Sequence, residues 1–306
     1  MDAEGGRDMD VESPPKPRMA SLVYHAGALG DFITTLPAMT AWRKIREAER
    51  MLLLGKPAYA ALALPAFDEV LDVESALCVP LFSAGTHLPD RLVKGLSGVT
   101  SALMFAHSSS PLVERLTAVG VRSILRQDPF PSTPIPVVDY HLSLFPGLRL
   151  TSEERAPRVD ISGSVQRAAE TTVAIHPGSG SSRKNWPLQR FAEVARRLHA
   201  EGEDVSWIVG PAEEGIALPP GAPVWRDLDL RSLAASLARC RLYIGNDSGV
   251  THLAAACGCP TVVLFGGSDP RVWLPRGRAM RAIESSSLDE ISVERVLTEC
   301  RKLIGM

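Results

Sequence analysis

The stretch YIGNDSGVTHLAAA, residues 243–256, carries the clearest structural signal in this chain. It begins as a buried strand end, continues through a Gly-Asn-Asp-Ser-Gly turn, and then starts a helix near Ser248. Asp247 is placed to cap that helix, because a short carboxylate accepts the otherwise unpaired amides of a first turn. The same helix end carries further small or polar residues, namely Ser248, Gly249, Thr251 and His252.

A helix N-terminus of this kind attracts phosphate, because its free N–H groups and its positive dipole end both favour an anion. In open α/β sheets such sites lie beyond the carboxyl ends of the strands. Two interpretations of residues 243–256 therefore stay open at this point. The segment binds a phosphate-bearing ligand, or it is a well-capped Rossmann-type helix with no ligand.

Length and composition describe a globular protein of 306 residues, with 45% hydrophobic residues and a net charge of −2. This length is sufficient for two domains, each with its own core. The near-neutral charge predicts no general attraction to nucleic acid. No run approaches the roughly 18 apolar residues of a membrane-spanning helix. Residues 1–20 are polar and lack the apolar centre of a secretory signal, so we expect a disordered extension there.

The cysteines are scattered and the histidines show no ligand spacing, so we expect neither a metal site nor a disulfide framework. Cys257 and Cys259 lie between a helix and a strand, and we interpret them as small buried thiols. Asp227 and Asp229 have the spacing that metal-dependent sugar-nucleotide enzymes use. They immediately precede a helical stretch, which favours helix capping instead. Unpaired cysteines are typical of a reducing, cytoplasmic compartment.

The chain alternates short apolar runs with amphipathic stretches, which is typical of a parallel α/β architecture. In the first half, strands are expected at 21–25, 51–54, 69–73, 101–105 and 123–125, and helices at 35–47, 89–96, 111–119 and 137–145. In the second half, strands are expected at 172–176, 205–209, 224–225, 242–244 and 261–265, and helices at 187–200, 230–239, from 248 onward and at 291–304.

Residues 151–171 are mostly charged or small, and we interpret them as a linker between the halves. The pattern predicts two Rossmann-like domains, 21–150 and 172–306, that face each other across a cleft. The last helix, 291–304, is a candidate to pack back on the first domain.

The segment GALGD, residues 27–31, connects the first strand to the first helix. Gly27 and Gly30 allow a sharp turn, which leaves Asp31 at the helix start and at the carboxyl end of the strand. Asp31 is either a helix cap or a general base that takes a proton from an attacking hydroxyl. The spacing is not GxGxxG, so the dinucleotide fingerprint is absent.

The loop HPGSGSSRKNWP, residues 176–187, is rich in Gly and Ser and also lies between a strand and a helix. The backbone and hydroxyl groups of Ser179, Gly180 and Ser181 can surround an anion, and Lys184 adds a point charge. The loop is not a Walker A motif, because Lys184 is not preceded by Gly or followed by Ser or Thr. A solvated surface loop is the weaker alternative.

A third loop, FGGSDP at residues 265–270, follows a strand directly and is succeeded by Trp273. Its glycines place backbone at the carboxyl edge of the sheet. A loop that lines a substrate site and a purely structural turn explain it equally well.

Three stretches, taken in order, resemble glycosyltransferase family 9, the ADP-heptose:lipopolysaccharide heptosyltransferases. They are ALGDFITTLPAM, IHPGSGSSRKNWPLQRFAEVARRL and YIGNDSGVTHLAAACGCPTVVLFGGSDPRVW. The resemblance runs from about residue 21 to the end, with little signal across 57–135. It implies the α/β GT-B fold, with the acceptor mainly on the first Rossmann-like domain and the nucleotide-sugar on the second.

The resemblance also implies roles for single residues. The catalytic aspartate of the family maps onto Asp31. The donor-binding positions map onto two loops and one acidic residue, namely Ser179, Gly180, Ser181, Lys184, Glu213, Asp247, Ser248, Gly249 and His252. The family often has Arg or Lys six residues before the catalytic aspartate, where this chain has His25.

The activity that the resemblance implies is inverting, metal-independent transfer of heptose from ADP-heptose to a lipopolysaccharide-core or related glycan acceptor. ADP-heptose is then a substrate, and no cofactor is expected. The expected partners are a glycan or glycolipid acceptor and the cytoplasmic face of the inner membrane, contacted peripherally. Two other functions stay open. One is a GT-B sugar-nucleotide epimerase, and the other is a nucleotide-sugar-binding protein that has lost transfer.

Overall fold

The computed structural model describes residues 19–64, 66–83, 85–162, 172–213, 215–221 and 223–305. The predicted disordered extension falls almost wholly on residues 1–18, which lie outside the described residues. The predicted linker is described only up to residue 162.

The first domain is built on a five-stranded parallel sheet with the order β3-β2-β1-β4-β5. Its strands are β1 (Ala20–His25), β2 (Arg50–Gly55), β3 (Glu69–Asp72), β4 (Val99–Phe105) and β5 (Ser123–Gln127). Its helices are α1 (Leu29–Ile45), α2 (Pro57–Ala60), α3 (Asp90–Gly95), α4 (Leu112–Ala118) and α5 (Val137–Leu142). The central strand β1 is fully buried, and the chain passes from its carboxyl end into α1.

The second domain is built on a six-stranded parallel sheet with the order β11-β10-β9-β6-β7-β8. Its strands are β6 (Thr172–His176), β7 (Asp204–Val209), β8 (Val224–Arg226), β9 (Leu242–Asn246), β10 (Thr261–Phe265) and β11 (Met280–Glu284). Its helices are α6 (Leu188–Ala200), α7 (Leu230–Leu237), α8 (Gly249–Ala256), α9 (Pro270–Trp273) and α10 (Val293–Ile304).

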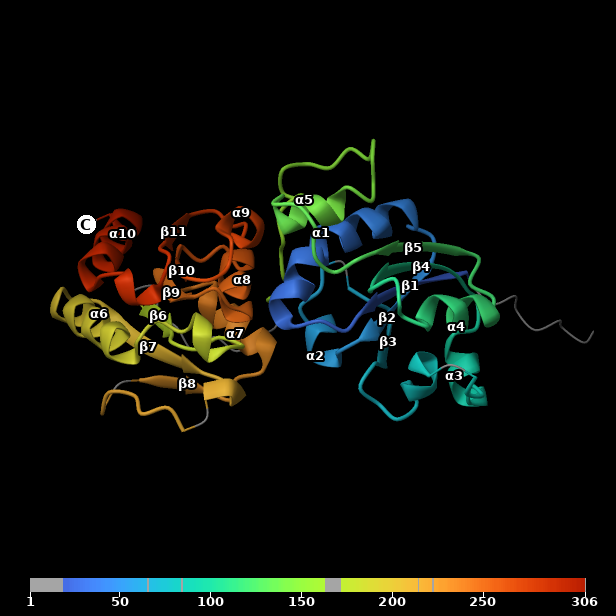
Figure 1. Cartoon of the computed structure of the whole chain (residues 1–306), viewed down its shortest axis with the longest axis horizontal. Coiled ribbons are helices and arrows are strands. Elements are labelled where there is room, and N and C mark those ends of the chain that lie inside the picture. The colour runs from blue at the N-terminus through green and yellow to red at the C-terminus, as the bar shows by residue number, and fades with distance from the viewer. Residues whose placement is uncertain are drawn as a thin grey trace, which may run out of the picture.

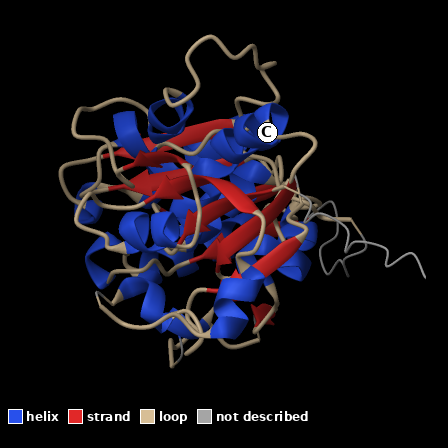
Figure 2. Cartoon of the chain, turned by 90° about the vertical axis from the view of Figure 1, so that its right-hand side faces the viewer, coloured by secondary structure: helices blue, strands red, loops and turns tan. Residues whose placement is uncertain are grey.

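Helices cover both faces of each sheet, as the layers of strands between helices in Figure 2 show. One apolar cluster fills the outer face of the first sheet and another fills the α6–α10 side of the second. A third cluster crosses the domain boundary, because it joins the inner side of α1 to α7 and α8. The two domains therefore share one continuous core, and Figure 1 shows α1 and α8 meeting at the boundary.

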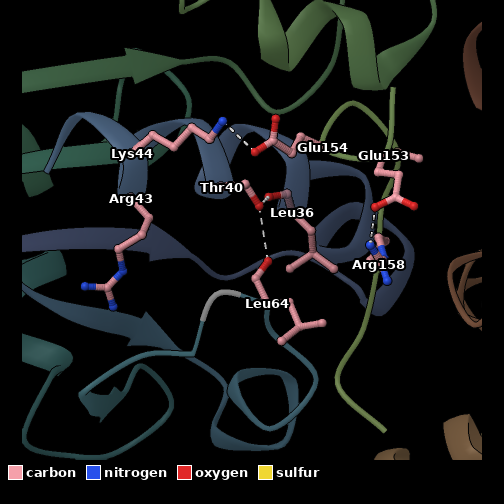
Figure 3. Close-up of a pocket in the computed structure, with 9 residues that line it drawn as sticks. Leu36, Thr40, Arg43, Lys44, Leu64, Glu153, Glu154 and Arg158 are labelled. Atoms are coloured by element: carbon pink, nitrogen blue, oxygen red, sulfur yellow. Dashed lines mark hydrogen bonds and ion pairs between the residues drawn. The ribbon is translucent and has the colours of Figure 1, made fainter. Parts of the chain in front are cut away.

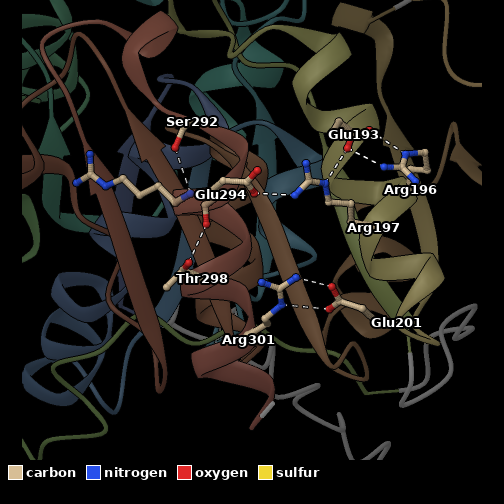
Figure 4. Close-up of polar contacts among 9 residues, drawn as sticks. Glu193, Arg196, Arg197, Glu201, Ser292, Glu294, Thr298 and Arg301 are labelled. Atoms are coloured by element: carbon tan, nitrogen blue, oxygen red, sulfur yellow. Dashed lines mark hydrogen bonds and ion pairs between the residues drawn. The ribbon is translucent and has the colours of Figure 1, made fainter.

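The final helix α10 packs on α6 and on strands β9 to β11 of its own domain. Ion pairs join the two helices on their exposed side, as Figure 4 shows. Arg197 Nη1 lies 2.7 Å from Glu294 Oε2, and Arg301 pairs with Glu201. Helix α9 of the second domain contacts α5 of the first domain through Val272 and Trp273.

The predicted parallel α/β architecture is confirmed, and the expected strands lie within two residues of their observed bounds. The prediction that helix α1 begins at residue 35 is wrong, because the helix begins at Leu29. Gly30 is part of its first turn and does not belong to a loop. Pro37 therefore lies inside the helix, where it removes one backbone hydrogen bond. Ten buried residues of α1 hold the helix in place despite this loss.

Candidate active site between the domains

A cavity of about 330 Å³ lies between the carboxyl edges of the two sheets. We define its first-domain wall as Ala28, Gly30, Asp31 and Phe130, and its second-domain wall as Gly180, Ser181, Lys184, Asp247, Ser248, Gly249, His252 and Trp273. The structure thus brings together every predicted site residue except Ser179 and Glu213.

Asp31 is the only carboxylate of the first-domain wall. It is the third residue of α1 and accepts a hydrogen bond from the Ala28 N–H at Oδ2, 3.1 Å away. Partial burial, reinforced by the nearby Asp247 carboxylate, raises the pKa of Asp31, although the Ala28 N–H and Lys184 oppose the shift. A carboxylate with a raised pKa is a stronger base, and this one faces the cavity.

Lys184 and Asp247, which both belong to the second-domain wall, form an ion pair. Lys184 Nζ lies 2.8 Å from Asp247 Oδ2, and the Ser268 hydroxyl donates to the same oxygen over 2.5 Å. The prediction that Asp247 caps α8 is wrong, since the cap is the Ser248 hydroxyl, which accepts from the Thr251 N–H. Asp247 instead holds Lys184 at the cavity and ties in the loop after β10.

Asn246, which the sequence interpretation missed as a site-shaping residue, fastens two loops together. Its Nδ2 donates to Pro177 O over 2.8 Å, and its Oδ1 accepts from the Trp186 N–H over 2.9 Å. Both ends of the loop 177–186 are therefore anchored on β9. The position of Asn246 inside the Gly-Asn-Asp-Ser-Gly turn was the available signal.

Ser179 shapes this loop from inside. Its hydroxyl lies 2.7 Å from both Ser181 O and Asn185 Oδ1, and it accepts from the Ser181 N–H over 3.2 Å. Because these bonds engage the Ser179 hydroxyl, the groups that reach the cavity are those of Gly180, Ser181 and Lys184.

The N-terminus of α8 is rigidly held below the cavity. The Thr251 hydroxyl lies 2.5 Å from Asn246 O and 3.0 Å from the Tyr243 hydroxyl, which is fully buried. His252 is 6% exposed, and burial lowers its pKa to about 4. The imidazole is therefore neutral at pH 7, so it offers hydrogen bonding but no positive charge.

The two walls approach each other closely at a pair of glycines. A Cβ added to Gly249 would lie 3.0 Å from the Gly30 N and 3.0 Å from Leu29 Cβ. A Cβ added to Gly30 would lie 3.2 Å from His252 Cδ2. Glycine at both positions thus allows the N-termini of α1 and α8 to converge on one cavity, and both helix dipoles present their positive ends there.

Glu213 lies beneath the loop and outside the residues that line the cavity. Its Oε2 is 3.4 Å from His176 Nε2 and 3.0 Å from the Gly210 N, from which it accepts. Burial is the largest single effect and would raise the pKa of Glu213, but the interactions with His176 and the backbone N–H groups together outweigh it, so the pKa is lowered. Gly178 has no room for a side chain, because its Cβ would collide with Glu213.

His25 lies behind Gly27 at the end of β1 and is 3% exposed. Burial, with smaller effects from His141 and Lys56, lowers the pKa of His25 to about 3. Its ring meets Phe32 and Phe105 edge-on at centroid distances of 5.3 and 6.1 Å. His25 is therefore a neutral part of the core and does not provide the positive charge that the resemblance implies for this position.

Local contacts bear on the sequence interpretations of Asp229 and of the cysteines. Asp229 caps α7 by accepting from the Arg231 and Ser232 N–H groups, both over 3.0 Å, so the capping interpretation is confirmed. The five cysteines are free thiols. Cys259 is buried as expected, whereas Cys257 is only partly buried. Among the described residues, no group of three or more His, Cys, Asp or Glu side chains is arranged to hold a metal ion.

A second cavity of about 330 Å³ lies behind α1, between Leu36, Thr40 and the segment 153–158, as Figure 3 shows. Its charged groups already have partners in the protein. Lys44 Nζ is 2.5 Å from Glu154 Oε1, and Arg158 Nη1 is 3.0 Å from Glu153 Oε2. The interdomain cavity is the better candidate of these two for chemistry, because there a base with a raised pKa faces a lysine and a helix N-terminus.

Comparison with known proteins gives one family and many related structures. The model of glycosyltransferase family 9 (heptosyltransferase) matches residues 132–299. Lipopolysaccharide heptosyltransferase 2 of Salmonella typhimurium is 29% identical over 193 residues, which is 53% of this chain and 54% of that protein. Lipopolysaccharide heptosyltransferase 3 of Escherichia coli is 31% identical over 113 residues, which is 34% of this chain and 33% of that protein. These alignments thus span about a third to a half of the relatives' lengths.

Solved structures align over nearly the whole chain. A family 9 glycosyltransferase from Veillonella parvula has a TM-score of 0.75 at 18% identity, with 94% of this chain and 97% of that chain covered. ADP-heptose lps heptosyltransferase II of E. coli has a TM-score of 0.69 at 19% identity, with 94% and 98% covered. The E. coli heptosyltransferase WaaC, solved with ADP, has a TM-score of 0.68 at 16% identity, with 93% and 100% covered. At these identities the likeness establishes the fold, and it confirms the predicted GT-B arrangement.

Proposed function

Because the chain belongs to glycosyltransferase family 9, we propose that it transfers a heptose from ADP-heptose to a lipopolysaccharide-core or related glycan acceptor, with inversion and without a metal ion. The observation that carries the proposal is the cavity itself. Its first-domain wall holds one basic carboxylate, Asp31, and its second-domain wall gathers Lys184 and the N-terminus of α8. A base facing a diphosphate site is the arrangement that direct displacement needs.

The proposed reaction is a single displacement step. Asp31 takes the proton of an acceptor hydroxyl as that oxygen attacks the anomeric carbon of the donor sugar. The new glycosidic C–O bond forms while the bond between the anomeric carbon and the β-phosphate oxygen breaks, and ADP departs with that electron pair. Attack from the side opposite to the leaving group inverts the anomeric configuration.

The second-domain wall stabilises the leaving group. Negative charge develops on the β-phosphate as the bond breaks, and a preorganised cation with aligned N–H groups stabilises such charge. Lys184 supplies the cation, Gly180 and the α8 N-terminus at Gly249 supply backbone donors, and Ser181 supplies its hydroxyl. The Lys184 ammonium is about two-fifths exposed. When the donor binds, this ammonium contacts the phosphate as well as the Asp247 carboxylate.

The choice of ADP-heptose follows the relatives. Structural neighbours were solved with ADP, with ADP-2-deoxy-2-fluoro heptose, and with ADP-D-beta-D-heptose. Ser179 and Glu213, which the resemblance maps as donor-binding, have a supporting role in this proposal, because they set the shape of the loop that meets the diphosphate. Among the described residues, no helix is long and apolar enough to cross a membrane. The relatives are named lipopolysaccharide heptosyltransferases, and this supports placing the reaction at the cytoplasmic face of the inner membrane, with peripheral contact to the acceptor glycolipid.

The proposal is tested by incubating the purified protein with ADP-heptose and a heptose-deficient lipopolysaccharide core oligosaccharide. We expect a heptosylated product and free ADP in equal amounts, with the anomeric configuration of the new bond, determined by NMR, opposite to that of the donor. UDP- and GDP-sugars serve as controls for the nucleotide. Retention of configuration would refute direct displacement, and transfer from another nucleotide alone would refute the donor.

A further inference from the structure

Two aromatic rings, one from each domain, meet at the interdomain cavity. Phe130 follows β5 in the first domain, and Trp273 ends α9 in the second. Their ring centroids are 5.5 Å apart with an interplanar angle of 71°, an edge-to-face contact. Both side chains line the cavity that holds Asp31 and Lys184.

Trp273 is fixed in place by the first domain, although it belongs to the second. With Val272 it packs on an apolar cluster formed by Val137, Val138 and Leu142 of α5. The adjacent Arg276 pairs with Asp139 of the same helix, which locks the α9 segment against α5. Figure 1 shows α9 and α5 side by side at the domain boundary. The tryptophan therefore forms a rigid backing at the edge of the cavity.

Phe130 is only partly covered by the protein. It contacts Trp273 edge-to-face, yet 48% of the residue stays exposed, which makes it one of the most exposed large apolar residues among those described. An apolar ring that lines a cavity and stays in water gains free energy when a ligand covers it. The chemistry of the exposed ring thus selects a ligand with an apolar face.

We propose that Phe130, backed by Trp273, is the platform on which a sugar ring of the acceptor packs, and that it determines acceptor specificity. The inference rests on the proposed glycosyl transfer. One face of a pyranose ring presents C–H groups, and such a face packs on the weakly negative face of an aromatic ring. Phe130 and Asp31 belong to the same wall, so a sugar on Phe130 has its hydroxyl on the side of the base.

The adenine of the donor is the competing occupant of this ring. The groups suited to the donor diphosphate, Ser181, Lys184 and Gly249, all stand on the opposite wall. The aromatic pair also bridges to the first domain through α5, away from the loop 177–186 that meets the phosphates. These positions favour the acceptor sugar over the adenine as the group that packs on Phe130, and the experiment separates the two.

The test compares Phe130→Ala, Phe130→Tyr and the control Ile135→Ala in transfer assays with ADP-heptose and the heptose-deficient core oligosaccharide. Ile135 lies five residues beyond Phe130, is 39% exposed and does not line the cavity. We expect Phe130→Ala to raise the acceptor KM by about tenfold or more with less change in kcat. Phe130→Tyr keeps the ring, so we expect the wild-type KM for this variant. We expect the wild-type KM for Ile135→Ala as well.

Calorimetric titrations complete the design. The oligosaccharide is titrated into ADP-loaded protein, which measures the acceptor site without turnover, and ADP is titrated into the free protein. Weaker oligosaccharide binding with unchanged ADP affinity in Phe130→Ala supports the inference even if the wild type transfers no heptose, in which case only the proposed function fails. Weaker ADP binding, or unchanged KM and oligosaccharide affinity, overturns it.

Discussion

The two walls of the interdomain cavity are built in different ways. The second-domain wall is a network in which Asn246, Ser248, Thr251 and Ser179 fasten each loop to its neighbour by hydrogen bonds. The first-domain wall has one short turn, one carboxylate that accepts a single backbone hydrogen bond, and one exposed ring. Binding a diphosphate requires several backbone groups in fixed positions, whereas accepting a proton requires one side chain with the right pKa.

The difference predicts a division of labour. Changes in the first-domain wall should alter the chemical step or the acceptor, while changes in the second-domain wall should alter donor affinity. The pair Gly30 and Gly249, where the walls meet, should affect both.

The largest effect is expected for Asp31→Asn, which keeps the shape but cannot accept the proton. We expect kcat to fall by about 10²- to 10⁴-fold, the usual contribution of a general base. The affinity for ADP, measured by calorimetry, should stay within about twofold of wild type, because Asp31 stands on the other wall. A variant with near-normal kcat would show that Asp31 is only a helix-start residue.

The next effect is expected where the walls touch. Gly249→Val places side-chain atoms against the Gly30 backbone and Leu29, so the domains must move apart. We expect kcat/KM to fall by about 100-fold, because misplacement by roughly 1 Å is enough for such a loss. Gly267→Val is the matched control, since a Cβ at Gly267 meets nothing within 4 Å. Equal activities for the two variants would mean that the close approach is dispensable.

A smaller effect is expected for Lys184→Ala. We predict that the Kd for ADP rises by about tenfold, the size of one partly exposed charge-assisted contact. Lys302→Ala on α10, which removes an ion pair with Glu299, is the control and should bind ADP normally. An ADP affinity that is unaffected by loss of Lys184 would remove its assigned role.

The smallest effect concerns stability. The folded-state pKa of Asp31 is raised, so its protonated form favours folding and its ionised form at pH 7 disfavours it. We therefore expect Asp31→Asn to raise Tm at pH 7 by about 2 °C. The gain should shrink as the pH falls through the raised pKa, because wild-type Asp31 then becomes protonated. Thermal scans between pH 4 and pH 7 check both the sign and its pH dependence; a lower Tm for the variant at pH 7 would contradict it.

The same contrast explains what could be predicted from sequence. The second-domain wall was largely predictable, because Gly, Ser and Asn at fixed offsets between a strand and a helix leave few geometries. The exact role of Asp247 was not, since Asp and Ser are both good caps and only the tertiary contact with Lys184 decides between them.

The first-domain wall was predictable only at Asp31. Phe130 belongs to a stretch with no recognisable signal, and its place beside Trp273 depends on how α9 packs on α5, which no local pattern encodes. The start of α1 was misplaced because two glycines favoured a loop, whereas burial of the helix against both domains overrides that propensity.

The most direct test of the account is the pH dependence of kcat at saturating ADP-heptose and acceptor. If Asp31 is the base, wild-type kcat falls on the acid side as Asp31 becomes protonated, with a midpoint above the ordinary value of 3.8 because its pKa is raised. Asp31→Asn should show a low kcat with no such acid limb. The same acid limb in wild type and variant would contradict the account, since the proton would then be accepted elsewhere.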